Sequence, residues 1–186
     1  MVRKPSDAPG RLQRAAMALF IERGYDEVTV AEIAEQAGMT KRSFFNHFTD
    51  KRAVMFASAD ALQASVLAAL ADADADLGPL DAVVQAFMQA AAGMEDYPVL
   101  ARARQVIIDS SPDLRERDLL KMAEMTAAVA DALAARGVPR RDAILVAQVA
   151  TTVFTTAADE WVRDPRRGLA AAIQDTLDGL TAVLKT

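Results

Sequence analysis

The stretch TVAEIAEQAGMTKRSFFNHFTDKRAVM, residues 29–55, decides the fold predicted for this chain. It contains two short helical segments that begin after Thr29 and after Thr40, with Gly38 in the turn between them. Thr29 and Glu32 have the spacing of a capping box, in which each side chain satisfies a free backbone amide at the start of a helix. Two helices joined by a short glycine-containing turn are typical of a helix-turn-helix, although such turns also occur in many proteins with other functions.

The second helix of this motif, KRSFFNHF at residues 41–48, has a split apolar stripe. Phe44 and Phe48 are four residues apart, so both are predicted to pack inward. Phe45 then lies on an outer face. An aromatic ring that is exposed to water there is unusual unless it contacts a partner. On a DNA-binding surface such a ring has a role, because it can contact thymine methyl groups while an arginine binds guanine or phosphate. The outer residues are Lys41, Arg42, Phe45, Asn46 and His47.

Residues 11–56 resemble the TetR family of transcriptional repressors. The resemblance is carried, in order and spacing, by Thr29, Ile33, Ala34, Ala37, Gly38, Phe48 and Lys51. It implies a homodimer that binds a palindromic operator in double-stranded DNA and is released by a small molecule. The DNA contacts that it implies are Thr29, Thr40, Lys41, Arg42, Phe45, Asn46, His47 and Lys51. Phe45 departs from the family, which usually has tyrosine there, so a hydroxyl that would contact phosphate is missing.

Several of these residues also have a structural interpretation that does not involve DNA. Thr29 and Thr40 cap helices in any case, and capping is the first interpretation for both. His47 could form a hydrogen bond within the motif, and Lys51 could be a solvated charge. For Arg42 and Phe45 the DNA contact is the favoured interpretation.

The rest of the chain predicts an all-α fold of about nine helices, because alanine and leucine are abundant and helical spacing recurs throughout. The expected helices are 11–23, 30–37, 41–48, 51–73, 80–94, 98–108, 112–136, 139–162 and 166–184. We divide the chain into a DNA-binding head, 1–50, and a ligand-binding and dimerising body, 51–186. Residues 1–56 hold nine Lys and Arg against seven Asp and Glu, although the whole chain has a net charge of −5. A positive head on an acidic body can orient itself on a polyanion, but chance asymmetry explains the same numbers.

The last two predicted helices are apolar over much of their circumference, which requires cover on both sides. The resemblance implies that they form a four-helix bundle with a second copy of the chain. Burial inside a single chain would give the same periodicity. The predicted dimer interface consists of Val146, Val149, Val153, Ala157, Ile173, Leu177 and Leu180.

A cavity for the effector is expected between the helices of the body, where methionine suits an adaptable apolar pocket. For each candidate residue taken singly, ordinary core is the first interpretation and ligand contact the second. Residues 102–125 loosely resemble a branch of the family with acyl-CoA-like ligands, which implies that an arginine there binds phosphate or carboxylate. The predicted pocket residues are Phe87, Met94, Arg104, Ile108, Met122, Met125, Gln148 and Phe154.

Composition narrows the function classes. The 186 residues include no cysteine and a single histidine, which excludes disulfides, thiol catalysis and multi-histidine metal sites. The sequence has no glycine-rich phosphate loop, so an enzyme is not expected, and neither a cofactor nor a metal is expected. We expect neither an apolar run long enough to cross a membrane nor a signal peptide. A cytoplasmic protein is therefore predicted. The alternative is a helical protein-interaction module, which explains a bundle but not the DNA-like head.

Overall fold

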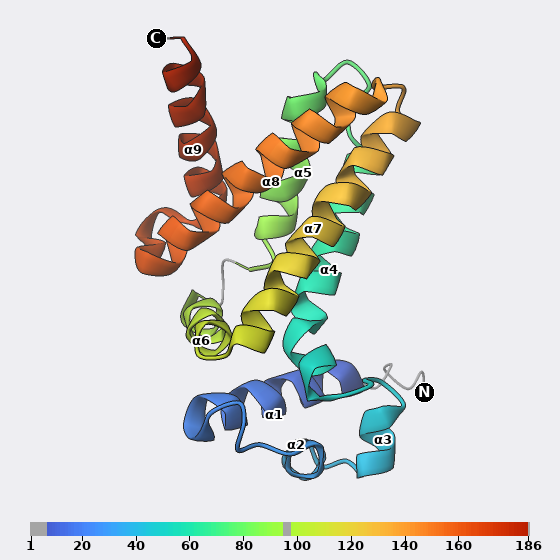
Figure 1. Cartoon of the computed structure of the whole chain (residues 1–186), viewed down its shortest axis with the longest axis vertical. Helices are drawn as coiled ribbons and strands as arrows, with labels where there is room; N and C mark the ends of the chain where they lie inside the picture. The colour runs from blue at the N-terminus through green and yellow to red at the C-terminus, as the bar shows by residue number, and fades with distance from the viewer. Residues whose placement is uncertain (1–6, 95–97, 186) are drawn as a thin grey trace, which may run out of the picture. The chain divides into compact units, whose positions relative to one another are not determined.

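The computed structural model describes residues 7–94 and 98–185, and within these ranges all regular secondary structure is helical. Figure 1 traces the elements in chain order. They are α1 (Ala8–Arg23), α2 (Val30–Gln36), α3 (Lys41–Phe45), α4 (Lys51–Ala71), α5 (Pro79–Ala91), α6 (Pro98–Asp109), α7 (Pro112–Ala135), α8 (Arg140–Arg163), the short 3-10 helix η1 (Pro165–Arg167) and α9 (Leu169–Leu184). The predicted all-α fold with nine α-helices is confirmed for the described part of the chain.

Each helix differs from its predicted extent by one to three residues at one end or both, and the differences at α3 and α9 have a clear physical cause. α3 ends at Phe45 instead of residue 48, because the carbonyl of Phe44 accepts from the amides of both His47 and Phe48, at 2.9 Å each, and this closes the helix in a turn. The last helix was expected to begin at residue 166. Gly168 has a φ of +75°, which separates η1 from α9 and delays the start of α9 to Leu169.

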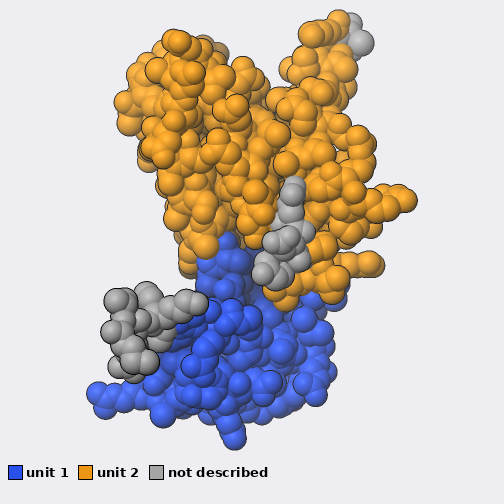
Figure 2. Space-filling model, turned by 180° about the vertical axis from the view of Figure 1, so that it is seen from behind, with its two compact units in different colours: residues 1–58, 103–115 blue, residues 59–102, 116–186 orange. Residues whose placement is uncertain are grey.

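The chain forms two compact units, which Figure 2 shows in two colours. Unit 1 contains residues 1–58 and 103–115, and unit 2 contains residues 59–102 and 116–186. The predicted division at residue 50 therefore differs from the packing in two ways. Unit 1 includes the first turns of α4, and it also includes a segment from the middle of the chain.

The core of unit 1 gathers side chains from six helices, α1 to α4, α6 and α7. Phe20, Ile33 and Phe44 come from the first three helices and are at most 1% exposed. Ile108 and Leu114, from residues 103–115, belong to the same cluster and are equally buried. The end of α6 and the first turn of α7 are thus part of the hydrophobic core of the unit that carries the helix-turn-helix.

Unit 2 is a helical bundle with an aromatic core. The rings of Phe87 on α5 and Phe154 on α8 stack at 4.7 Å between centroids, and Trp161 is 2% exposed in the same cluster. Arg136 donates to the backbone carbonyl oxygens of Leu70, at 2.9 Å, and of Asp74, at 3.0 Å, and so caps the C-terminal end of α4.

One described helix, α4, is long and apolar enough by length and composition to cross a membrane, with 21 residues and a mean hydropathy of 1.6. This corrects the expectation that no such run exists. Its apolar side chains have partners within the protein, because Phe56 lies in the core of unit 1 and Val66 and Leu70 lie in that of unit 2. Within unit 2, Asp60 on the same helix accepts from Lys121 at 2.7 Å. The buried side chains of α4 thus contribute to the cores of the protein.

Candidate nucleic-acid interface

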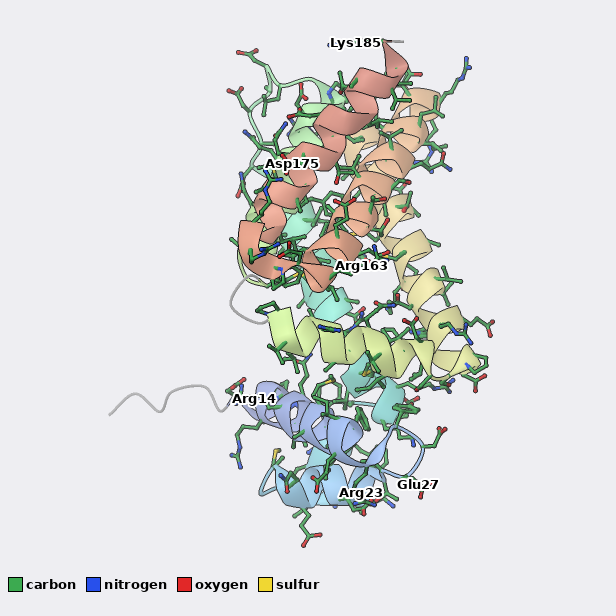
Figure 3. All side chains as sticks on the ribbon, turned by 90° about the vertical axis from the view of Figure 1, so that its left-hand side faces the viewer. Arg14, Arg23, Glu27, Arg163, Asp175 and Lys185 are labelled. Atoms are coloured by element: carbon green, nitrogen blue, oxygen red, sulfur yellow. The ribbon has the colours of Figure 1, made fainter. Side chains whose placement is uncertain are left out.

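The start of α2 is fixed by the predicted capping box. The Thr29 hydroxyl oxygen accepts from the Glu32 amide at 3.3 Å, and the Glu32 carboxylate accepts from the Thr29 amide at 2.8 Å and its hydroxyl at 2.7 Å. Arg23 donates to the same carboxylate at 2.7 Å and to the carbonyl of Glu27 at 3.0 Å; Figure 3 labels both residues. These hydrogen bonds, those from Thr29 first, lower the pKa of Glu32 to about 2. The Thr29 hydroxyl is therefore engaged in the cap.

The turn after α2 is a Schellman motif, in which two amides beyond the helix bond back to its last carbonyls. The Met39 amide donates to the Ala34 carbonyl at 2.8 Å, and the Gly38 amide donates to the Glu35 carbonyl at 2.9 Å. Gly38 has a φ of +66°, a conformation that favours glycine. The next free carbonyl, that of Ala37, accepts from the guanidinium of Arg11 on α1.

We expect Gly38→Ala to lower the free energy of unfolding by about 1–2 kcal/mol, because a side chain at this φ is strained. The new Cβ would also lie 3.0 Å from Nη2 of Arg11, which would have to move away from the Ala37 carbonyl. Urea denaturation followed by circular dichroism measures the change. The matched control is Gly93→Ala, where φ is not positive and the nearest atom is 3.7 Å away. Equal losses in both variants would contradict a special role for the turn.

α3 exposes one face and buries the other. Thr40 caps it, since the hydroxyl of Thr40 accepts from the Ser43 amide at 3.1 Å. Phe44 is fully buried, and the half-buried Phe48 lies against it with a centroid distance of 5.8 Å. Phe45 is 50% exposed and meets Phe44 edge to face at 5.5 Å. The predicted inward packing of Phe44 and Phe48 and the outward position of Phe45 are confirmed.

The exposed face of α3 and of the turn after it carries donors around an aromatic ring. Lys41, Arg42, Asn46 and His47 are all exposed, as is Phe45 between them. Such a surface offers charged donors for phosphate, a planar guanidinium for a guanine edge and an apolar face for a thymine methyl group. These five predicted residues are therefore brought together in one place.

Lys51 has a different task from the predicted phosphate contact. Its ammonium group donates to the backbone carbonyls of Tyr25, Asp26 and Val28, at 2.8, 3.2 and 3.1 Å. It also lies 4.3 Å from the centroid of the Tyr25 ring. Burial raises the pKa of Tyr25 to about 12, so the ring faces Lys51 as a neutral phenol. Lysine has three N–H donors, and all three are used inside the protein.

Two family profiles match the chain and together span most of it. The profile described as "Bacterial regulatory proteins, tetR family" matches residues 12–57, and the MftR C-terminal domain matches residues 77–185. The transcriptional regulator TcmR of Streptomyces glaucescens is 30% identical over 183 residues, covering 91% of this chain and 81% of that protein. MftR of Mycobacterium tuberculosis, named for the regulation of mycofactocin biosynthesis, is 25% identical and covers 98% of this chain and 93% of its own length.

The chain belongs to the TetR family. It is a DNA-binding regulator of transcription and not an enzyme, and the interaction-module alternative is not favoured. Dimerisation and repression are typical of TetR-family proteins. A solved structure of FadR from Bacillus subtilis with stearoyl-CoA has the same fold, with a TM-score of 0.63 at 17% identity, covering 91% of this chain and 95% of that one.

The residues predicted to form the effector pocket of this TetR-family protein fall in three places. Phe87, Met125 and Phe154 lie in the core of unit 2, and Met94 and Met122 are half-buried in that unit. Arg104 and Ile108 belong to unit 1, where the Arg104 guanidinium lies 5.3 Å from the Phe56 ring centroid. Gln148 is exposed on α8. Of the predicted pocket residues, Phe87, Met125 and Phe154 are therefore the ones that lie in one cluster, the core of unit 2.

The predicted dimer residues divide in a similar way. Val153, Ala157 and Ile173 are at most 3% exposed within the single chain, so they hold α8 and α9 together and offer little surface to a second copy. Val146, Val149, Leu177 and Leu180 are half-buried. Between α8 and α9 lies a groove of about 390 Å³, lined by Gln148, Val149, Thr152, Val153, Thr156, Thr176 and Leu180. The face open to a partner is thus richer in threonine than predicted.

Two features that shape this candidate interface were not predicted from the sequence. Arg11 holds the end of α2, and the segment around Ile108 and Leu114 completes the core beneath the motif. Charge patterns and periodicity do not predict which backbone carbonyl will accept a hydrogen bond from a given arginine. Ile108 was predicted from the sequence to line the effector pocket, whereas it lies in the core of unit 1.

Proposed function

We propose that this TetR-family regulator binds its operator as a homodimer and inserts α3 of each copy into the major groove. The observation that carries the proposal is the division of α3 into a buried side at Phe44 and an exposed side at Arg42 and Phe45. A major groove about 12 Å wide admits a helix, and a twofold dimer presents two such helices to two half-sites.

The residues of the exposed face take different roles in this proposal. Arg42 contacts a guanine edge, since its planar fork suits the two acceptors there. Phe45 contacts a thymine methyl group, and Lys41, Asn46 and His47 bind phosphate or base edges. Thr29 and Thr40 serve first as caps, because their hydroxyls are already engaged in α2 and α3.

The second copy is proposed to pack on the α8–α9 face. This face has an open groove with a partly apolar lining, to which Val149 and Leu180 contribute. Covering it on both sides would complete a four-helix bundle of two α8 and two α9 helices, in the symmetric arrangement of most homodimers.

The effector is proposed to be a small apolar molecule that binds among α5, α7 and α8 and releases the DNA. The aromatic and methionine side chains of Phe87, Met125 and Phe154 support an apolar site. An acyl-CoA-like ligand stays a prediction, because Arg104 lies in unit 1 and the apolar residues lie in unit 2. Release requires that the effector prefer a state in which the two α3 helices no longer match the half-sites. The named bacterial relatives support action in the cytoplasm.

Arg42→Ala tests the proposal. We expect the affinity for an operator selected from genomic fragments to fall about tenfold to hundredfold, the value of one good bidentate base contact, while the protein stays folded and dimeric. Fluorescence anisotropy at several salt concentrations measures the affinity. The control Arg141→Ala removes the same charge from an exposed position on α8 and should leave binding unchanged. If Arg42→Ala keeps the same preference for its operator, the proposed base contact of Arg42 is wrong.

A further inference from the structure

α2 is held at both ends by cations that come from other helices. At its start, Lys51 of α4 binds the three carbonyls of the loop that leads into α2. At its end, Arg11 of α1 binds the carbonyl of Ala37. We propose that Lys51 and Arg11 are positioning residues that set the orientation of α2 and, through the Gly38 turn, that of α3. The inference rests on the proposed function, in which α3 reads DNA.

The contacts of Lys51 suit a compact ammonium group that is held within the protein. Three carbonyl oxygens converge on one nitrogen within 2.8–3.2 Å, and the ring of Tyr25 covers another side at 4.3 Å. An ammonium group has three N–H donors around a single atom, which suits converging acceptors. A guanidinium spreads its donors over a rigid plane and cannot direct them to one point.

Arg11 meets the opposite end of α2. The last carbonyls of a helix carry partial negative charge, and a cation there is stabilising. Its guanidinium on the Ala37 carbonyl joins the turn to α1 at the residue before Gly38. The two cations therefore fix the entry and the exit of a helix of only seven residues.

α3 depends on this support because it is too short to set its own direction. It has five residues, and isolated helices of that length are not stable in water. Its position comes from the Phe44 anchor and from the turn that α2 presents. A binding residue on α3 must be held to within a fraction of an ångström to reach a base edge, so a loosened α2 would cost sequence discrimination.

Lys51→Arg separates this role from a direct phosphate contact. Arginine binds phosphate at least as well as lysine, so a phosphate contact at this position would survive the change. If Lys51 positions α2, operator affinity should fall about tenfold or more, with non-operator affinity within about twofold, because base readout is lost while total charge stays the same. The matched control is Lys185→Arg, at the C-terminal end of α9 (Figure 3), which should change neither affinity.

A second measurement does not depend on DNA. We expect faster amide hydrogen exchange at Val28 and throughout α2 in free Lys51→Arg, and no change in Lys185→Arg. If Lys51→Arg does not fold, Arg11→Met tests the other end of α2 and should give the same two results. Retained operator affinity together with unchanged exchange would overturn the inference. Failure of the unmodified protein to bind any operator would instead overturn the proposed function, and the exchange experiment would still decide the positioning role.

Discussion

Phe44→Ala should destabilise unit 1 by about 3–5 kcal/mol, the usual loss when a fully buried aromatic ring is removed from a core. Phe44 is 0% exposed, and its ring contacts those of Phe45 and Phe48 at 5.5 and 5.8 Å. Small domains are stable by only about 5–15 kcal/mol, so this single change removes a large share of the total. Urea denaturation with circular dichroism gives the free energy directly, and we expect a large drop in the midpoint.

The neighbouring residue provides the matched control. Phe45→Ala removes the same ring one position along α3, but that ring is 50% exposed and loses only an edge contact, worth about 0.5–1.5 kcal/mol, and part of its burial. Phe45→Ala should therefore stay folded and lose operator affinity instead. Similar losses of stability in the two variants would contradict the division of α3 into a buried and an exposed face.

Local chemistry made much of the N-terminal structure predictable. The capping box at Thr29 and Glu32 was predicted from two residues three apart, because the reciprocal bonds depend only on that spacing. The positions of Phe44 and Phe45 followed from helical periodicity in the same way. The end of α3 was placed three residues too late, because apolar spacing continued to Phe48 while the Phe44 carbonyl closed the helix earlier.

Long-range partners were not predictable by the same route. The resemblance to the TetR family implied a phosphate contact for Lys51, but the carbonyls that this residue binds are 23 to 26 residues away in the sequence. The apolar residues of α8 and α9 have a helical period whether they face the same chain or a second copy. Burial of Val153, Ala157 and Ile173 decides this for three of them, and the sequence alone could not.

Leu180→Glu should convert the proposed dimer into a monomer and reduce operator affinity by at least about 100-fold. Leu180 lines the groove between α8 and α9, so in a symmetric dimer the change places two carboxylates in one covered interface. Burying unpaired charges is costly, and the dimer dissociates to keep them in water. A monomer then holds one half-site at a time and loses the gain of about 10²–10⁴ that linked binding events provide. Analytical ultracentrifugation measures the mass, and fluorescence anisotropy measures the affinity.

Leu119→Glu is the matched control, because Leu119 is 72% exposed on α7 and lies outside the groove. This variant receives the same charge and should remain dimeric with full operator affinity. Thr152→Glu guards against simple misfolding of Leu180→Glu, since Thr152 is exposed within the single chain yet lines the same groove. A folded, dimeric Thr152→Glu protein that binds the operator normally would show that a second copy packs elsewhere. Loss of the dimer in the two groove variants alone would place the partner on the α8–α9 face.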